Sequence, residues 1–261
     1  MHDLSPLYNK AFICTCSDKK ADKLGLLLKK KGARLIKMPL ITIGKSLLTP
    51  GINFVLEQIN SFDWLFFTSG YGVDCFFDLM HQLKINGTWK KKLKYAVIGK
   101  ATAETLSGYG IEADYISDAP GAEQLAVNFL NNIEATGLRI LFPAGNLSGS
   151  RVSEILKDRH ELVTVTVYHT HTVKYPDKQA LNLLSSGNYD MILFLSPSAF
   201  NSFMTVCHPV LRLKTYRIGC LGPATAGAVI SSGLDPDFIG EGRGIVELVR
   251  QLEKHYCTSL I

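Results

Sequence analysis

What this sequence lacks excludes several classes of protein. No apolar run approaches the roughly 20 residues that a membrane-spanning helix requires. The first ten residues, MHDLSPLYNK, contain an acidic residue and a proline but no apolar segment. We therefore expect no signal peptide, no membrane partner and a cytoplasmic location.

Motifs for bound cofactors and metals are also missing. The glycine-rich motifs G-x-x-x-x-G-K-[ST] and G-x-G-x-x-G are absent, as is the G-x-S-x-G turn of hydrolases. The six cysteines form neither a C-x-x-C pair nor a metal-ligand spacing, and we interpret them as buried, reduced, structural thiols. His169 and His171 have strand spacing but no evident third ligand, so we interpret them as solvated linker residues. We expect no cofactor and no metal.

The charge balance is mildly basic. The 28 Lys and Arg residues exceed the 23 Asp and Glu residues by five. Lysine clusters at 29–31 and 90–92 have no interleaved aromatic residues, and no nucleic-acid motif is present. We interpret both clusters as solvated surface and expect no nucleic-acid partner. A basic cleft for an acidic small molecule remains the alternative.

What the sequence does contain is an internal repeat, which runs from 63 to 114 and again from 190 to 237. DWLFFTSGYGVDCFF in the first copy matches DMILFLSPSAFNSFM in the second. One set of matched positions has an offset of 127 residues (190 − 63), and another has an offset of 123 residues (222 − 99). The first set comprises Asp63/Asp190, Phe67/Phe194, Ser69/Ser196 and Phe76/Phe203, and the second comprises Gly99/Gly222, Thr102/Thr225, Gly110/Gly233 and Asp114/Asp237. Copies of about 125 residues predict two similar domains that face one another, because solenoid repeats are much shorter.

Short apolar runs alternate with amphipathic segments along the chain. The runs are continuous, as in WLFF and YAVI, which is typical of parallel strands buried on both faces. Strands are expected at 11–16, 64–68, 95–98, 114–116, 139–142, 163–172, 191–195, 217–221 and 237–239, with a strand-like run at 33–43 that Pro39 interrupts. Helices are expected at 18–31, 52–61, 71–83, 101–107, 123–131, 151–159, 177–186, 199–206, 224–231 and 244–254, and a loop at 143–150. This order predicts an α/β fold of two flavodoxin-like, parallel-sheet domains.

The copies do not divide the chain at its midpoint. A strand–helix unit at 11–32 precedes the first copy, and a related unit at 139–160 precedes the second. Each copy can have one such strand–helix unit as a neighbour if the unit at 11–32 packs with the second copy. We therefore expect a discontinuous domain of 1–38 plus 173–261, a domain of 45–164, and two crossover linkers at 39–44 and 165–172.

Small hydroxylic and glycine residues follow the expected strands. In open parallel sheets, ligands bind beyond the carboxyl ends of the strands, where the N–H groups of helix starts attract anions. Serines and threonines at helix starts are also ordinary N-caps, and that interpretation suits any one loop. Two matched sets around a shared cleft favour carboxylate or phosphate binding instead. The candidate residues are Ser69, Gly99, Thr102, Gly145, Ser196, Ser198, Gly222 and Thr225.

Tyr168 is the candidate general acid. It lies on the second expected crossover, which would line the base of the cleft. The alternative is an aromatic residue packed at a domain junction. Without cofactor, metal or triad, catalysis would depend on orientation and electrostatics.

The ordered set of motifs resembles the uroporphyrinogen-III synthase family over nearly the whole chain. FFTSGYGVDCFF is similar to the family's FTS-x-x-(A/G)-V-x-x-F, and VIGKATAETLSGYGIEAD to its VG-x-x-TA-x-x-L-x-x-x-G-x-x-AD. GAEQLA, ILFPAGNLSGSR, VTVYHT and LGPATAGAVISSGLDPD resemble further family segments in the same order. Leu195 and Ala224 stand where a matching hydroxyl is expected, so the second set of loops is less polar.

The resemblance implies a cofactor-independent hydro-lyase of tetrapyrrole and heme biosynthesis. Its substrate would be hydroxymethylbilane, which is cyclised with loss of water and inversion of ring D. The implied roles are assistance by Tyr168 in hydroxyl departure and binding of substrate carboxylates by Arg151 and the loop residues above. A transient contact with hydroxymethylbilane synthase and a monomeric state are also expected. The alternative is a non-catalytic, anion-binding or sensory module of the same fold.

Overall fold

The computed structural model describes residues 4–119, 121–211 and 215–258. The chain forms two compact units, which are described separately. Unit 1 comprises Met1–Ile43 with His171–Ile261, and unit 2 comprises Gly44–Thr170. Within the described ranges, no helix combines the length and the apolar character that crossing a membrane would require.

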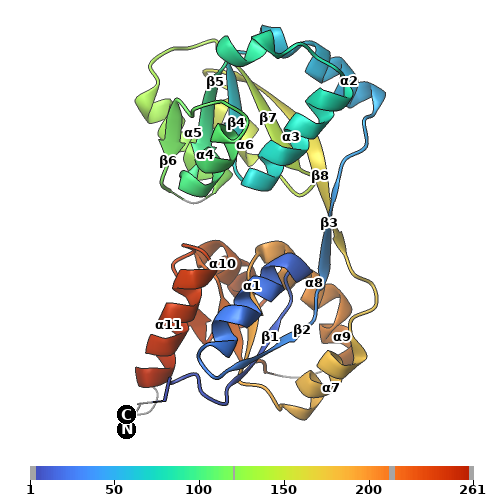
Figure 1. Cartoon of the computed structure of the whole chain (residues 1–261), viewed down its shortest axis with the longest axis vertical. Helices are drawn as coiled ribbons and strands as arrows, with labels where there is room; N and C mark the ends of the chain where they lie inside the picture. The colour runs from blue at the N-terminus through green and yellow to red at the C-terminus, as the bar shows by residue number, and fades with distance from the viewer. Residues whose placement is uncertain (1–3, 120, 212–214, 259–261) are drawn as a thin grey trace. The chain divides into compact units, whose positions relative to one another are not determined.

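Unit 1 is built on a five-stranded sheet with the order β11-β10-β9-β1-β2. Figure 1 labels β1 and β2 of this sheet. Every neighbouring pair is parallel. The strands are β1 (Ala11–Cys14), β2 (Arg34–Lys37), β9 (Met191–Phe194), β10 (Ile218–Cys220) and β11 (Phe238–Ile239). β1 therefore pairs with β9, which is the arrangement in which the first strand–helix unit packs with the second copy.

Helices cover both faces of this sheet. The helices are α1 (Asp18–Lys29), α7 (Lys178–Ser186), α8 (Pro197–Val206), α9 (His208–Leu211), α10 (Pro223–Ser231) and α11 (Ile245–Thr258). Alternate strand residues face opposite sides. Ile13, Ile192 and Ile218 pack with α7, α8 and α10, whereas Phe12 and Leu193 pack with α1 and α11. This two-sided burial explains why the strands are continuous apolar runs.

Unit 2 contains a six-stranded sheet with the order β3-β8-β7-β4-β5-β6, in which the strands from β8 to β6 pair in parallel. The strands are β3 (Ile41–Lys45), β4 (Trp64–Phe67), β5 (Lys94–Ile98), β6 (Tyr115–Ser117), β7 (Arg139–Gly145) and β8 (Glu161–Thr172). The helices are α2 (Pro50–Glu57), η1 (Ile59–Ser61), α3 (Gly70–Gln82), η2 (Gly87–Lys91), α4 (Gly99–Ser107), α5 (Ala122–Asn132) and α6 (Arg151–Leu156). α2, α3 and α4 pack on one face, and α5 and α6 on the other.

The two sheets have matching strand orders. In unit 1 the order β2-β1-β9-β10-β11 is the flavodoxin-like 2-1-3-4-5, and in unit 2 the corresponding strands are β8, β7, β4, β5 and β6. The structure confirms the predicted α/β class with parallel sheets. In each unit the strand order reverses at one point, between β1 and β9 in unit 1 and between β7 and β4 in unit 2. These two points are the topological switch points of the sheets.

Four repeated aspartates have the same structural role in both copies. Asp63 and Asp190 accept hydrogen bonds from the backbone N–H of Arg139 and Ala11, the first residues of β7 and β1, at 2.8 Å each. In the same way Asp114 accepts from Tyr95 N at 2.8 Å, and Asp237 from Ile218 N at 2.6 Å. These carboxylates secure the amino ends of neighbouring strands. They therefore lie at the opposite ends of the strands from the carboxyl ends, where the candidate ligand-binding residues were predicted.

Two expectations about local structure were wrong, and two short helices were not anticipated. Pro143 and Ala144 belong to β7 and not to a loop, because β7 continues to Gly145 alongside the long strand β8. The short helices η2 and α9 were not anticipated, since each lasts only about one turn. Cys257 is exposed on α11, while the other five cysteines are buried as predicted.

Candidate functional site

Ser69 and Ser196 occupy equivalent positions at the carboxyl ends of β4 and β9. Each is the N-cap of the helix that follows. The Ser69 hydroxyl accepts a hydrogen bond from Gly72 N at 3.1 Å, and the Ser196 hydroxyl accepts one from Ala199 N at 3.3 Å. Ser196 also lies 3.0 Å from the hydroxyl of Ser198. Both serines thus have the capping role, and both remain partly exposed beside the strand ends.

Tyr168 lies next to Ser69 because β8 contains a bulge. The register pairs Ala144 with Thr166 but Gly145 with Tyr168, so Val167 is left unpaired. Strict alternation would direct Val167 and Tyr168 to opposite faces, yet both pack against the same core cluster. Bulges re-aim side chains in this way, and here the bulge brings the phenol to the switch point of unit 2.

Gly145 provides the space for the Tyr168 ring. A Cβ atom at position 145 would lie 2.4 Å from Tyr168 Cε2 and 2.7 Å from Cζ. Only glycine permits this approach without displacement of the ring. Gly72, in the first turn of α3, has its Cβ position 3.8 Å from Tyr168 Cε1 and forms another side of the same enclosure.

The environment of Tyr168 keeps its hydroxyl protonated. Burial raises the pKa of the Tyr168 phenol above its usual value near 10, although a hydrogen bond from the Ser69 hydroxyl acts in the opposite direction. At neutral pH the phenol is therefore a hydrogen-bond donor. Its position at a switch point suits donation to an oxygen of a bound ligand.

The matched threonines are less accessible than expected. Thr102 and Thr225 are only 5% and 4% exposed, so their side chains are mainly part of the core. Gly99 begins α4 with φ of +71°, a conformation that favours glycine, and no atom lies near its Cβ position. Gly222 instead packs against a neighbouring backbone, since its Cβ position is 2.7 Å from Gly242 Cα. Ligand access in these loops is therefore greatest along the backbone.

Arg151 lies on the surface at the first position of α6. Its guanidinium group is 3.8 Å from a carboxylate oxygen of Glu123 and 3.5 Å from one of Glu154. These exposed ion pairs contribute little stability and exchange readily with other anions. The arginine is thus available to an anionic ligand, although it is not preorganised for one.

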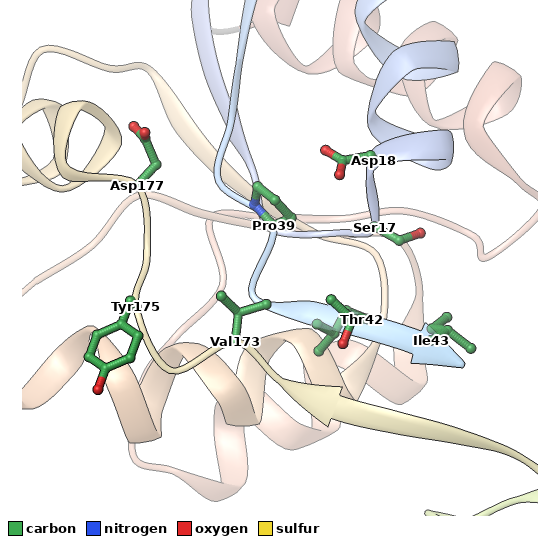
Figure 2. A pocket seen from close by; sticks show the side chains of 9 residues that line it. Ser17, Asp18, Pro39, Thr42, Ile43, Val173, Tyr175 and Asp177 are labelled. Atoms are coloured by element: carbon green, nitrogen blue, oxygen red, sulfur yellow. The ribbon is translucent and has the colours of Figure 1, made fainter. Parts of the chain in front are cut away.

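Unit 1 has a cavity of about 510 Å³ (Figure 2). It lies beyond the carboxyl ends of β1 and β2. The lining residues are Ser17, Asp18, Pro39, Ile41, Thr42, Ile43, Val173, Tyr175 and Asp177. In Figure 2, Asp18 and Asp177 lie on opposite sides of Pro39. The volume is within the range of small-molecule sites, and the mixed lining suits a ligand with both apolar and polar groups.

The sequence did not identify this cavity, because Pro39 and Asp177 come from distant segments. It also did not identify Tyr71, which lies in the first turn of α3 with its ring centroid 5.3 Å from that of Tyr168. The available signal was an aromatic residue directly after the strand-end sequence TSG. His169 and His171 lie on β8, and within the described ranges no group of three His, Cys, Asp or Glu side chains is placed to hold a metal ion.

The fold and these strand ends define a protein of two flavodoxin-like α/β units, each with a candidate ligand site beside its switch point. Comparison with known proteins narrows this class. The family model described as uroporphyrinogen-III synthase HemD matches residues 22–250. The uroporphyrinogen-III synthase of Synechococcus elongatus is 26% identical over 231 residues, which is 85% of this chain and 86% of that protein. The chain belongs to the uroporphyrinogen-III synthase family.

Solved structures agree on the fold. A mutant uroporphyrinogen III synthase of Thermus thermophilus superposes with a TM-score of 0.70 at 16% identity, covering 95% of this chain and 99% of that one. The uroporphyrinogen-III synthetase of Helicobacter pylori gives a TM-score of 0.58 at 16% identity, covering 97% and 100%. At these identities the likeness concerns the fold alone.

Proposed function

We propose that this protein converts hydroxymethylbilane to uroporphyrinogen III. In this reaction the terminal C–O bond of the linear tetrapyrrole breaks, the oxygen leaves as water, and the ring closes through a spiro intermediate that inverts ring D. Family membership favours this enzymatic function over a non-catalytic module of the same fold. The supporting observation in the molecule is the protonated phenol of Tyr168 at a switch point.

Tyr168 would assist the departure of the hydroxyl group. A phenol with a raised pKa is a weak acid, so its main contribution would be a hydrogen bond to the leaving oxygen and not complete proton transfer. The substrate ionises readily to an azafulvene, so this modest assistance is sufficient. The larger requirement is to hold the flexible chain in the conformation that leads to the inverted ring.

The helix starts would bind the substrate's acetate and propionate groups. α3, α4, α8 and α10 each begin at the carboxyl end of a strand, and their first N–H groups attract carboxylates. Ser69, Gly99, Thr102 and Gly145 would contribute in unit 2, and Ser196, Ser198, Gly222 and Thr225 in unit 1, with Thr102 and Thr225 acting mainly through the backbone. Arg151 would exchange its surface partners for a substrate carboxylate. The net charge of +5 favours an acidic ligand overall.

The remaining parts of the proposal concern partners and location. Because hydroxymethylbilane closes spontaneously to the type I isomer, transient contact with hydroxymethylbilane synthase would limit that loss. We propose a cytoplasmic monomer, and sedimentation of the purified protein with and without the synthase would test both the monomer and the contact.

The decisive experiment is a coupled assay. Purified hydroxymethylbilane synthase with porphobilinogen forms the linear tetrapyrrole, and chromatography of the oxidised products separates the type I and type III isomers. Addition of this protein should replace type I by type III. If type I remains the product at equimolar protein, the proposed function is wrong.

A further inference from the structure

The ring of Tyr71 contacts the ring of Tyr168, the candidate catalytic residue. We propose that Tyr71 is a positioning residue, whose aromatic ring holds the Tyr168 phenol at the carboxyl ends of β4 and β7. This inference rests on the proposed function, because Tyr168 is the group that it positions. Tyr71 would act through its ring and not through its hydroxyl.

The Tyr168 ring is confined on three sides by groups that cannot move far. The Gly145 backbone lies directly against it, as the 2.4 Å clash of a Cβ atom shows, and the Gly72 backbone faces its other edge. The Ser69 hydroxyl, which is itself fixed as a helix cap, lies close enough to the phenol to act on its pKa. Tyr71 supplies a further side, with its ring at 5.3 Å between centroids and 73° between planes. This edge-to-face geometry is favourable for an aromatic pair.

Tyr71 lies on a helix that is fixed in the core. It is one helical turn before Cys75 on α3, and Cys75 is buried in the core of unit 2. The Tyr71 residue nevertheless remains 37% exposed. A partly exposed ring in the first turn of such a helix can restrain a neighbour while also facing a bound ligand.

Tyr168 needs such restraint because backbone pairing fixes its Cα atom but not its ring. The Val167 carbonyl accepts a hydrogen bond from Ser46 N at 3.0 Å and the Tyr168 carbonyl accepts one from Asn146 N at 3.1 Å, so the backbone is held, whereas the side-chain rotamer depends on packing. A phenol that is free to change rotamer would spend less time near the leaving oxygen. Turnover would slow, and spontaneous closure to type I would compete with it.

The experiment compares variants at position 71 in the coupled assay, with kcat, KM and the isomer ratio as readouts. Tyr71→Phe keeps the ring and should stay within about twofold of wild type. Tyr71→Leu keeps apolar bulk without a flat ring, and Tyr71→Ala removes both. Both should lower kcat up to about tenfold, with little change in KM and a larger share of type I product.

Two controls separate positioning from general damage. Cys75→Ala shortens a buried side chain one helical turn from Tyr71 but keeps both rings, and it should lower kcat less than Tyr71→Ala. Phe54→Ala removes another exposed aromatic side chain of unit 2, on α2, and should change nothing. Urea unfolding of each variant tests whether the protein is folded, and if Tyr71→Ala does not fold, the comparison rests on Tyr71→Leu.

The outcomes are distinct. Wild-type kinetics and isomer ratio in Tyr71→Ala or Tyr71→Leu would overturn the inference while leaving the proposed function intact. A Tyr71→Phe variant as defective as Tyr71→Ala would assign the effect to the hydroxyl and would also overturn it. Failure of the wild-type protein itself to form type III would instead remove the proposed function.

Discussion

Gly145→Ala is the sharpest test of how Tyr168 is held. Gly145 is not in the left-handed region, so alanine is permitted by the backbone, and the whole effect must come from the added methyl group. That group would lie 2.4 Å from Cε2, 2.7 Å from Cζ and 3.0 Å from the hydroxyl oxygen of Tyr168. The substitution is therefore a local displacement of one phenol.

The magnitude follows from these distances. Ordinary contacts begin at 3.4 Å, so the ring must retreat by about 1 Å. Overpacking of this kind costs about 1–3 kcal/mol of unfolding free energy. A displacement of about 1 Å in a catalytic group reduces the rate by roughly 100-fold. We therefore expect a large loss of type III synthesis with a modest loss of stability.

The assay combines kinetics with a double-mutant cycle. Urea unfolding is measured for wild type, Gly145→Ala, Tyr168→Ala and the double variant, and type III formation for the first two. In the Tyr168→Ala background no ring remains to be displaced, so Gly145→Ala should cost close to nothing. The coupling free energy should equal the cost of the single substitution, about 1–3 kcal/mol.

Gly227→Ala is the matched control. Gly227 lies in α10 with no atom near its Cβ position, and there alanine should stabilise the protein by about 0.4–1 kcal/mol without affecting catalysis. The reasoning about Gly145 is refuted if Gly145→Ala retains activity within twofold. It is also refuted if the substitution has the same cost in both backgrounds, since the clash would then not involve Tyr168.

Other predictions address the acid, the strand ends and pH. Tyr168→Phe should lower turnover at least tenfold, equivalent to about 1.4 kcal/mol, and near-wild-type kinetics in the coupled assay would remove the hydroxyl from the mechanism. Asp190→Ala should cost about 1.5–3 kcal/mol in urea unfolding because it releases Ala11 N and Lys10, whereas Asp190→Asn should cost less; equal costs would contradict the role of its acceptor oxygen. Burial, with a smaller effect of Arg159, lowers the pKa of His160, which is 5% exposed and whose ring nitrogens have no hydrogen-bond partner among the described residues. A histidine whose pKa is lower in the folded state than in the unfolded state contributes stability above its unfolded pKa, near 6.5. The free energy of unfolding should therefore decrease as the pH drops below 6.5. His160→Leu should show a weaker pH dependence between pH 7.5 and 5.

Much of the fold could be predicted from local patterns. Continuous apolar runs of four residues, such as 64–67 and 191–194, indicate strands covered on both faces, because such runs are too short for a buried helix and successive strand residues face opposite sides of the sheet. The repeated serines at 69 and 196 predicted helix starts, because a serine hydroxyl can accept a hydrogen bond from an N–H group that the first turn of a helix leaves unpaired. Both serines make this capping bond in the structure. The repeated aspartates were recognised as matched positions, although their role at the strand ends was not.

The candidate site was only partly predictable. Tyr168 and Gly145 were both identified, but nothing in their sequence separation shows that the ring lies against the glycine. That contact depends on a register shift between β7 and β8, and a shift of one residue changes the face of every side chain beyond it. Thr102 and Thr225 match each other in sequence, yet their place in the first turns of helices directs them into the core.

The sequence by itself determined the class of the fold, its duplication and its family, since these depend on periodicities and motifs that local chemistry imposes. The tertiary structure alone decided which side chains from distant segments meet: Tyr168 with Gly145 and Tyr71, and Pro39 with Asp177 around the unit 1 cavity. The physical reason is that strand pairing and register are settled by the packing of whole faces. The free energy of that packing comes from contacts between distant segments, so no short stretch of sequence determines it.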